Sequence, residues 1–409
     1  MDDNDGKKKQ VLNSGPLKGI KILDAAAVLA GPVTATILGD FGADVVKLEQ
    51  PITGDFTRRR ASERGGRSLQ WVQEGRNKKS ITLNLRLREG QELFRKMLAP
   101  FDVLIINYRP PTLESWGLDV FELHRQYPKL IILSLTGYGM SGPLSGRGAF
   151  DRIASAYSGL TYTSGEKDGP PVRSGYALID YMGAYLGSFG LLLALYERDK
   201  NGGDGQIIDL ALYEAGFRAS EDALMDYSSN GVVRERHGNR NRNVVPAEDV
   251  VCEDGVRVAF HAGTDSLFAR LTEVMGRKEL AEDPRFKGYH DRVKNQLVLY
   301  SIIEEWAATK NAETIEKELA DKGVPVSRLM TIEDIANSEH YRSRESIVEV
   351  DDVEFGQVLM PGIFPKLLNT PGSIRSLGPE LGSSNRQIYM EMFGLGEDEI
   401  AGLKERGVI

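Results

Sequence analysis

The feature that most constrains the fold is a repeated alternation of short apolar runs with helix-like segments across the first half of the chain. Runs rich in Val, Ile and Leu are typical of strands buried on both faces of a sheet. We expect strands at 20–24, 43–49, 79–85, 102–107, 129–136 and 205–210, with helices at 31–38 and 89–98 among the connections. Because strands that alternate with helices form parallel sheets, this pattern predicts a doubly wound α/β domain.

The second half of the chain has a different pattern. The charged run 234–243 indicates a loop or linker, and 248–262 is typical of a hairpin that turns at Asp254-Gly255. Helices are expected at 266–275, 293–308 and 312–322, and further strands near 347–358.

These segments predict a Rossmann-like doubly wound parallel sheet with a second, smaller α+β domain. We place the large domain at 17–229, the small domain at 230–330, and a segment that returns to the large domain at 331–409. Residues 1–16 are polar and carry no apolar signal core, so we expect a flexible tail.

Length and composition narrow the class of protein. A chain of 409 residues is long enough for two domains. The net charge of −8 argues against generic nucleic-acid or membrane-surface binding, because no excess of Lys and Arg is present to neutralise phosphates. The single Cys252 and five scattered histidines give neither a disulfide nor metal-ligand spacing. The longest apolar stretch, 187–196, is shorter than the ~20 residues of a membrane span, so we expect a cytoplasmic protein.

The segment Gly137-Tyr-Gly139-Met-Ser-Gly142 has the spacing of a dinucleotide-binding fingerprint and follows an expected strand. A fingerprint requires a helix to begin directly after the glycines, yet Pro143, Gly146 and Gly148 follow. We therefore interpret the segment as a glycine loop that shapes a cleft.

Two acids stand at the expected starts of helices. Asp180 comes immediately before a helix that contains Gly183, Gly187 and Gly190, and Asp151 begins another at 152–157. The simplest interpretation of both is a helix N-cap. For Asp180 a functional role is compatible, because a carboxylate at a helix N-terminus would be kept ionised, as a nucleophile requires. The role of Asp151 stays open.

Short basic clusters at 58–60 and 76–79 lie before or between expected strands. Such clusters are usually solvated, but at the carboxyl ends of parallel strands they can bind anionic ligands.

Taken together, several segments resemble the class III coenzyme A transferases, the family of formyl-CoA transferase and carnitine CoA transferase. The resemblance covers essentially 17–409. Its motifs occur in order along the whole chain, and include Ala30-Gly-Pro32, Leu38-Gly-Asp-Phe-Gly-Ala-Asp44, Gly54-Asp-Phe-Thr-Arg58, Asn107-Tyr-Arg-Pro110, Asp283-Pro-Arg-Phe286, Gly323-Val-Pro325 and Leu377-Gly-Pro379.

The resemblance implies that Asp180, which matches the family's nucleophile, carries CoA as an aspartyl-CoA thioester. An acyl-CoA would then be a substrate, with no permanently bound cofactor and no metal. It also implies that CoA lies along the first domain, near Leu83, Asn84, Leu85, Arg86, Asn107, Tyr108 and Arg109, and that Gly148, Phe150 and Asp151 line the approach to Asp180. Family members form interlocked dimers, so we expect an oligomer.

The chain also departs from formyl-CoA transferase. Leu29 replaces a glutamine, Gln50 a basic residue near the adenine, and Ser384 a common histidine, while the glycine run over the active site is not recognisable. The arginines at 240 and 242 favour a dicarboxylic substrate, with succinyl-CoA as donor and an acid such as malate, citramalate, itaconate or benzylsuccinate as acceptor.

Two alternatives remain. The same fold hosts 2-methylacyl-CoA racemases, which need a histidine directly before the position of Asp151. That position is Phe150, which cannot transfer a proton. The chain could instead be the non-catalytic structural subunit of a heteromeric transferase, with Asp180 retained only as a cap.

Overall fold

The computed structural model describes residues 15–60 and 62–409. The predicted tail at 1–16 therefore lies almost entirely outside the described residues. The described chain divides into two compact units. The first takes the residues up to Leu160 together with Ser174–Asp222 and Glu345–Ile409, and the second takes Thr161–Arg173 and Ala223–Arg344. Unlike the predicted domains, the second unit includes 161–173 and extends to 344.

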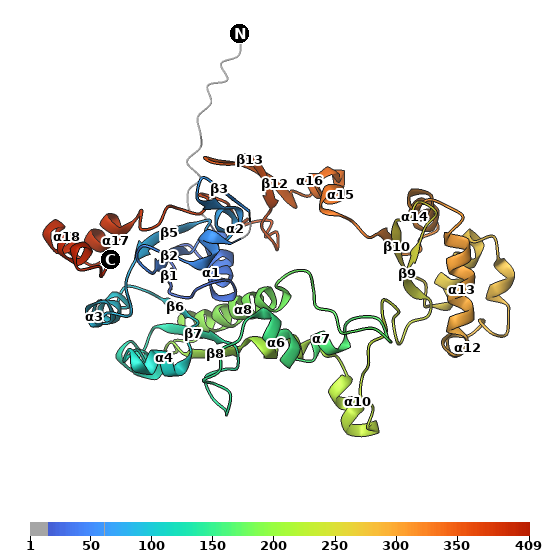
Figure 1. The fold of residues 1–409 in the computed structure, drawn as a ribbon, viewed down its shortest axis with the longest axis horizontal. Helices are drawn as coiled ribbons and strands as arrows, with labels where there is room; N and C mark the ends of the chain where they lie inside the picture. The colour runs from blue at the N-terminus through green and yellow to red at the C-terminus, as the bar shows by residue number, and fades with distance from the viewer. Residues whose placement is uncertain (1–14, 61) are drawn as a thin grey trace, which may run out of the picture. The chain divides into compact units, whose positions relative to one another are not determined.

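The first unit contains a six-stranded parallel sheet (Figure 1). Its strands lie in the order β5 (Lys78–Thr82), β2 (Asp44–Glu49), β1 (Lys21–Asp24), β6 (Val103–Ile106), β7 (Ile131–Thr136) and β8 (Ile207–Ala211). Counted along the chain, this is the doubly wound order 3-2-1-4-5-6, as the alternation predicted. The order reverses between β1 and β6, which is where such sheets open a crevice at the carboxyl ends of their strands.

Helices cover both faces of this sheet. Successive strand residues point to opposite faces, so Ile105 belongs to the core beneath α1 (Ala30–Asp40) and α8 (Leu178–Lys200), whereas Ile106 faces Phe94 of α3 (Arg88–Met97). The core on the side of Ile106 and Phe94 also contains residues of α5 (Val120–Gln126), α17 (Asn385–Glu391) and α18 (Glu397–Glu405).

Helix α8 is long and largely apolar. Its 23 residues contain an 18-residue window of mean hydropathy 1.5, half of it buried, so it is long and apolar enough to cross a membrane by those criteria. The apolar stretch 187–196 noted in the sequence lies inside this helix. Here the helix packs on the sheet: a Cβ on Gly187 would lie 3.0 Å from Leu133 Cδ2, and one on Gly183 2.8 Å from Leu212 Cδ2. Its glycines allow this close approach.

The C-terminal segment packs on the edge strand β5. The Asn77 side chain accepts from the backbone amide of Arg375 at 2.7 Å, and the Tyr389 hydroxyl donates to the carbonyl of Thr82 at 2.7 Å. The other elements of this unit are η1 (Phe56–Arg59), β3 (Glu63–Arg64), β4 (Arg67–Ser68), α2 (Leu69–Glu74), α4 (Pro110–Ser115), α6 (Asp151–Tyr157), α9 (Leu212–Arg218), β12 (Ile347–Asp352) and β13 (Gly356–Pro361), and α7 (Leu160–Thr163) lies at its boundary.

The second unit is built on a three-stranded antiparallel sheet of order β11 (Val326–Arg328), β10 (Arg257–His261), β9 (Ala247–Val251). The predicted hairpin at Asp254-Gly255 is confirmed, since β9 and β10 pair antiparallel about it. The buried guanidinium of Arg292 joins the core segments by donating to the Val245 and Gly263 carbonyls at 3.0 and 2.8 Å. The helices are α10 (Ala223–Asn230), α11 (Asp265–Val274), η2 (Lys278–Ala281), α12 (Tyr289–Lys294), α13 (Gln296–Ala307), α14 (Ala312–Asp321), α15 (Ile332–Asn337) and α16 (Glu339–Ser343).

Candidate active site

Asp180 lies in the first turn of α8, with only 7% of its surface exposed. The helix begins at Leu178, and Ala177 occupies the N-cap position without a side-chain hydrogen bond. The interpretation of Asp180 as the N-cap was therefore wrong. Asp180 lies three residues after the N-cap residue Ala177.

Asp151 supplies the missing cap from another helix. Its Oδ2 accepts from the backbone amides of Ile179 and Asp180 at 2.8 and 3.4 Å. Asp151 is itself the first residue of α6, whose N-cap residue, Phe150, makes no side-chain cap bond. The carboxylate expected to cap its own helix therefore caps α8 and lies beside Asp180.

Burial raises the pKa of Asp180 to about 7 from an ordinary value of 3.8. The negative charge of Asp151 adds to this rise in pKa, and the positive charge of Arg60 opposes it. Burial thus opposes the ionised state that the helix terminus was expected to favour. Near neutral pH the group exchanges between a neutral acid and an unusually basic carboxylate.

The loops after β1 and β6 meet at the reversal of strand order. Asn107 accepts from the amide of Ala27 at 2.8 Å and donates to its carbonyl at 2.7 Å. Next to it, Arg109 donates to the Gly146 carbonyl at 3.1 Å, and a Cβ on Gly148 would lie 4.0 Å from Arg109 Nη1. The loop that runs from Gly148 through the exposed Phe150 to Asp151 thus connects the end of β6 to the first turn of α8.

The other residues expected around CoA lie more separately. Leu83 and Leu85 bury their side chains in the core that contains Phe94, while Arg86 is exposed. The ring of Tyr108 packs edge-on against Trp116, with 5.0 Å between centroids. Residues 83–86 follow β5 and residues 107–109 follow β6. Because β2 and β1 lie between these strands, the two groups of residues leave the sheet about 14 Å apart, so only a long ligand could contact both.

A buried ionic cluster lies under the turn that follows β1. Lys47 forms ion pairs with Asp24 and Asp55 at 3.5 and 3.2 Å, and Lys78 with Asp24 at 2.9 Å. Although burial disfavours the Lys47 ammonium, these carboxylates raise its pKa overall. The Asp55 carboxylate also accepts from the amide of Val28 at 3.2 Å.

Val28 is in the left-handed region, at φ 71°, which is a strained conformation for a β-branched residue. Val28, Ala177 and Tyr181 pack against a small core that contains Leu29, and the last two lie on either side of Asp180 in the chain. The sequence analysis did not predict this turn. Asp55, in the matched motif Gly54–Arg58, was the one visible signal for it.

The basic clusters are largely engaged within the fold. Arg58 pairs with Glu49 through Nε and Nη2, both at 2.7 Å, and its guanidinium lies 3.9 Å from the centre of the Trp71 ring. Arg76 pairs with Asp40, and Lys79 pairs with Asp44 at 2.9 Å.

The glycine loop does not lead into a helix. Gly139 and Gly142 have φ of 84° and 83°, and the amide of Met140 donates to Asp209 at 2.9 Å. The next helix, α6, begins only at Asp151. The prediction that this segment is not a dinucleotide fingerprint agrees with that geometry.

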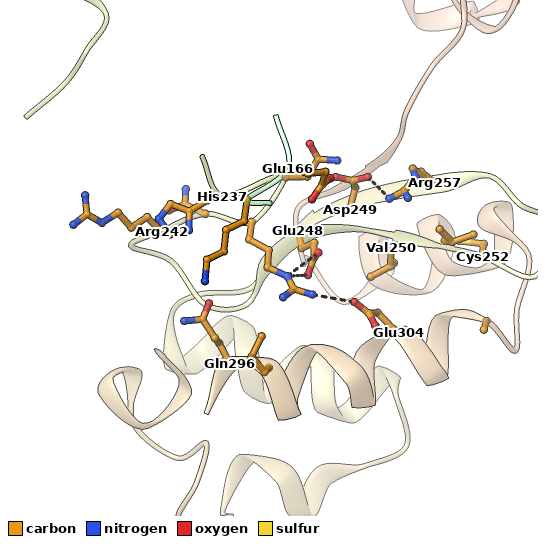
Figure 2. Close-up of a pocket in the computed structure, with 17 residues that line it drawn as sticks. Glu166, His237, Arg242, Glu248, Asp249, Val250, Cys252, Arg257, Gln296 and Glu304 are labelled. Carbon is orange, nitrogen blue, oxygen red and sulfur yellow. Dashed lines mark hydrogen bonds and ion pairs between the residues drawn. The ribbon is translucent and has the colours of Figure 1, made fainter. Parts of the chain in front are cut away.

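The second unit contains a pocket of about 790 Å³, with Glu248, Glu304 and Gln296 on its walls (Figure 2). Arg240 points its guanidinium at these acids, with Nε 3.0 Å from Glu248 Oε1 and Nη2 3.3 Å from Glu304. Arg242 pairs with Asp226 at 3.4 Å. Each of the two arginines expected to favour a dicarboxylic substrate thus has an acid of the protein as its ion-pair partner. Within 15–60 and 62–409, no group of three His, Cys, Asp or Glu side chains is placed to hold a metal ion.

A buried acid of raised pKa on a doubly wound sheet is typical of the active site of an α/β enzyme. The chain matches the family model described as CoA-transferase family III over residues 17–385. It is 42% identical over 399 residues to the succinyl-CoA–L-malate CoA-transferase beta subunit of Chloroflexus aurantiacus, covering 96% of this chain and 98% of that protein.

Two further comparisons agree. The chain is 37% identical over 395 residues to the succinyl-CoA–D-citramalate CoA-transferase of the same organism, covering 96% of this chain and 98% of that one. The crystal structure of a CAIB/BAIF family protein from Brucella suis superposes with a TM-score of 0.81 at 30% identity, covering 93% of this chain and all of that one. The chain therefore belongs to CoA-transferase family III and is a class III CoA transferase.

Proposed function

We propose that this enzyme moves CoA from succinyl-CoA, or another dicarboxylic acyl-CoA, to a carboxylic acid through an aspartyl-CoA thioester on Asp180. The observation that carries the proposal is the buried carboxyl of Asp180, with a pKa of about 7, in a class III CoA transferase. The relatives named for succinyl-CoA and L-malate or D-citramalate support the substrate class.

The chemistry proceeds in four steps. The Asp180 carboxylate attacks the donor thioester carbonyl and the C–S bond breaks. This step releases CoA thiolate and forms an acyl-aspartyl anhydride. The thiolate then attacks the aspartyl carbonyl and releases the donor acid. The acceptor carboxylate attacks the aspartyl-CoA thioester to form a second anhydride, and the released thiolate attacks its acyl carbon, which yields the new acyl-CoA and free Asp180.

The environment of Asp180 suits these steps. Exclusion of water protects the anhydride and thioester from hydrolysis, since 93% of the side chain's surface is covered and only 7% is exposed. A carboxylate with a pKa near 7 is a stronger nucleophile than one near 4, and burial still leaves a substantial ionised fraction at neutral pH. Asp151 holds the first turn of α8, which fixes where that carboxylate lies.

The substrate's CoA portion is proposed to extend along the carboxyl ends of β5, β1 and β6. Arg86 is exposed and offers a guanidinium to phosphate, while Asn107, Tyr108 and Arg109 follow β6. Gly148, Phe150 and Asp151 then lead to Asp180. A CoA thioester is long enough to contact both groups.

We also propose an oligomer, as a dimer of this chain or with a related subunit. One face of α8 leaves large apolar side chains in solvent, among them Phe189 at 59% and Leu193 at 54% exposure. Tyr185 and Tyr196 continue the same stripe at helical spacing. A patch of this kind is typical of an interface between protein chains. Two relatives from Chloroflexus aurantiacus are named as beta and alpha subunits of one transferase.

The test is to trap the intermediate. We expect hydroxylamine added during turnover with succinyl-CoA to convert Asp180 to a hydroxamate, detected by mass spectrometry of the 174–198 peptide. Asp180→Asn should abolish both the adduct and CoA transfer. Asp204→Asn, which changes an exposed acid paired with Lys129, should alter neither. An adduct on another residue, or an active Asp180→Asn enzyme, would refute the proposal.

A further inference from the structure

Three successive arginines, Arg58, Arg59 and Arg60, end the segment around η1, and they have different partners. Arg58 is held by Glu49 and by the Pro379 carbonyl at 3.0 Å. Arg59 is exposed and donates to the Thr53 carbonyl at 2.9 Å. In the part of the chain that the structure describes, the Arg60 guanidinium is half-buried and has no ion pair or hydrogen bond.

The N–H donors of Arg60 are therefore not taken up by an acid of the protein. Surface arginines lie in water, and buried ones are normally paired, as Arg58 and Arg76 are here. Arg60 therefore has the character of a group whose anionic partner is a ligand.

Contacts on both sides of Arg60 connect its segment to the first turn of α8. On its N-terminal side, Asp55 accepts a hydrogen bond from the amide of Val28, and Val28 packs against the same small core of Leu29, Val33 and Ala184 as Ala177 and Tyr181 of the α8 end. On its C-terminal side, the hydroxyl of Ser68 donates to the Arg60 carbonyl, and Ser68 caps α2.

Helix α2 returns to the same turn of α8. The Tyr181 hydroxyl donates to Glu74 of α2 at 2.9 Å. Arg60 thus lies on a short segment anchored at both ends to the residues that flank Asp180. Consistently, its charge lowers the pKa of Asp180 against the effect of burial.

We propose that Arg60 binds the carboxylate of the dicarboxylic substrate that does not react, while the other end of the substrate meets Asp180. This inference rests on the proposed function and adds the residue that selects the substrate. A guanidinium fits a carboxylate through two parallel N–H donors, which fixes the orientation of a short chain as well as its charge.

The same cation serves a second purpose. A dicarboxylic donor brings an extra negative charge to a site that already contains Asp151 and Asp180, and like charges close together repel. Arg60 offsets that repulsion. Arg240 and Arg242 differ from Arg60 in this respect, because both already pair with acids of the protein.

The experiment compares two thioesters that differ only at the remote end. Succinyl-CoA is measured as a substrate. Butyryl-CoA, which lacks the second carboxylate, is measured as a competitive inhibitor. Both measurements are made on the wild type and on Arg60→Gln, Arg60→Lys and Arg59→Gln. In Arg60→Gln we expect kcat/KM for succinyl-CoA to fall about 100-fold while the inhibition constant of butyryl-CoA changes less than about 3-fold. Arg60→Lys should keep part of the rate, because it keeps the charge. Arg59→Gln, the matched control, should behave like wild type.

Equal loss for both thioesters would mean that Arg60 serves the fold or general CoA binding, and an unchanged succinyl-CoA rate would exclude it from recognition. Either result overturns the inference. Failure of the proposed function is seen separately, as retained transfer in Asp180→Asn. An inactive Asp180→Asn together with unchanged selectivity in Arg60→Gln would reject Arg60 alone.

Discussion

A buried nucleophile with a raised pKa should make this enzyme more active and less stable over the same range of pH. The relevant perturbation is Asp180→Asn, which keeps the size of the side chain and removes its ionisation. The pKa of Asp180 rises from 3.8 to about 7, chiefly through burial. Between these values the unfolded chain has released a proton that the folded chain still holds.

The sign and size of the effect follow from proton linkage. Because the folded state binds more protons in this window, the free energy of unfolding falls as pH rises from about 4 to about 7. Linkage with the two pKa values gives a loss of roughly 2–3 kcal/mol between pH 5 and pH 8. Asp180→Asn lacks this loss, so its advantage over wild type should grow by that amount. Over the same range, the ionised fraction rises about tenfold from pH 6 to pH 8, and kcat/KM should rise with it.

Thermal unfolding at pH 5 and pH 8 checks the first effect. The difference in Tm between Asp180→Asn and wild type should be about 3–5 °C larger at pH 8. Asp204→Asn is the control, because its exposed acid should give the same difference at both pH values. The reasoning would be refuted if the Asp180→Asn advantage stayed constant with pH, or if the kcat/KM of wild type were flat from pH 6 to pH 8.

Three other predictions follow from particular contacts. Asp151→Asn keeps an oxygen to cap α8 but removes a like charge, so the pH at which kcat/KM rises should fall by roughly one unit with little change in Tm, as a pH–rate profile will show. Lys47→Met leaves buried acids without their cation and should lower the free energy of unfolding by about 3–5 kcal/mol in a urea titration. Phe189→Glu together with Leu193→Glu places charges on the apolar face of α8 and should shift the enzyme to smaller species in sedimentation velocity, whereas unchanged assembly would exclude this face from the interface.

The fold of the first unit was predictable because its strands are buried on both faces. Val103–Ile106 is entirely apolar, and every residue of Ile131–Thr136 is buried, since helices cover each side of the sheet. Such runs identify parallel strands, and strands that follow one another in the chain usually lie side by side in the sheet. The assignment of 161–173 to the second unit could not be predicted, because that segment carries turn residues and no periodic apolar pattern.

The candidate site was only partly predictable, because its residues act through contacts that span the chain. Local rules describe what a carboxylate does to its own helix, and they led to Asp180 and Asp151 as two separate caps. The structure instead uses Asp151 to cap the helix of Asp180, a contact between positions 28 residues apart. That exchange frees the Asp180 carboxyl from capping and brings a second negative charge beside it.

The same limit applies to the arginines. Arg58 and Arg60 are alike in sequence, and only the packing of Glu49 beside one of them shows which is structural and which still lacks an acid. Local chemistry therefore indicates which residues can act, whereas the distribution of partners decides which of them remain available to a substrate. In this enzyme the available groups are a basic carboxyl on α8 and a guanidinium at the end of η1, and together they have the charge pattern of a site for a dicarboxylic acid.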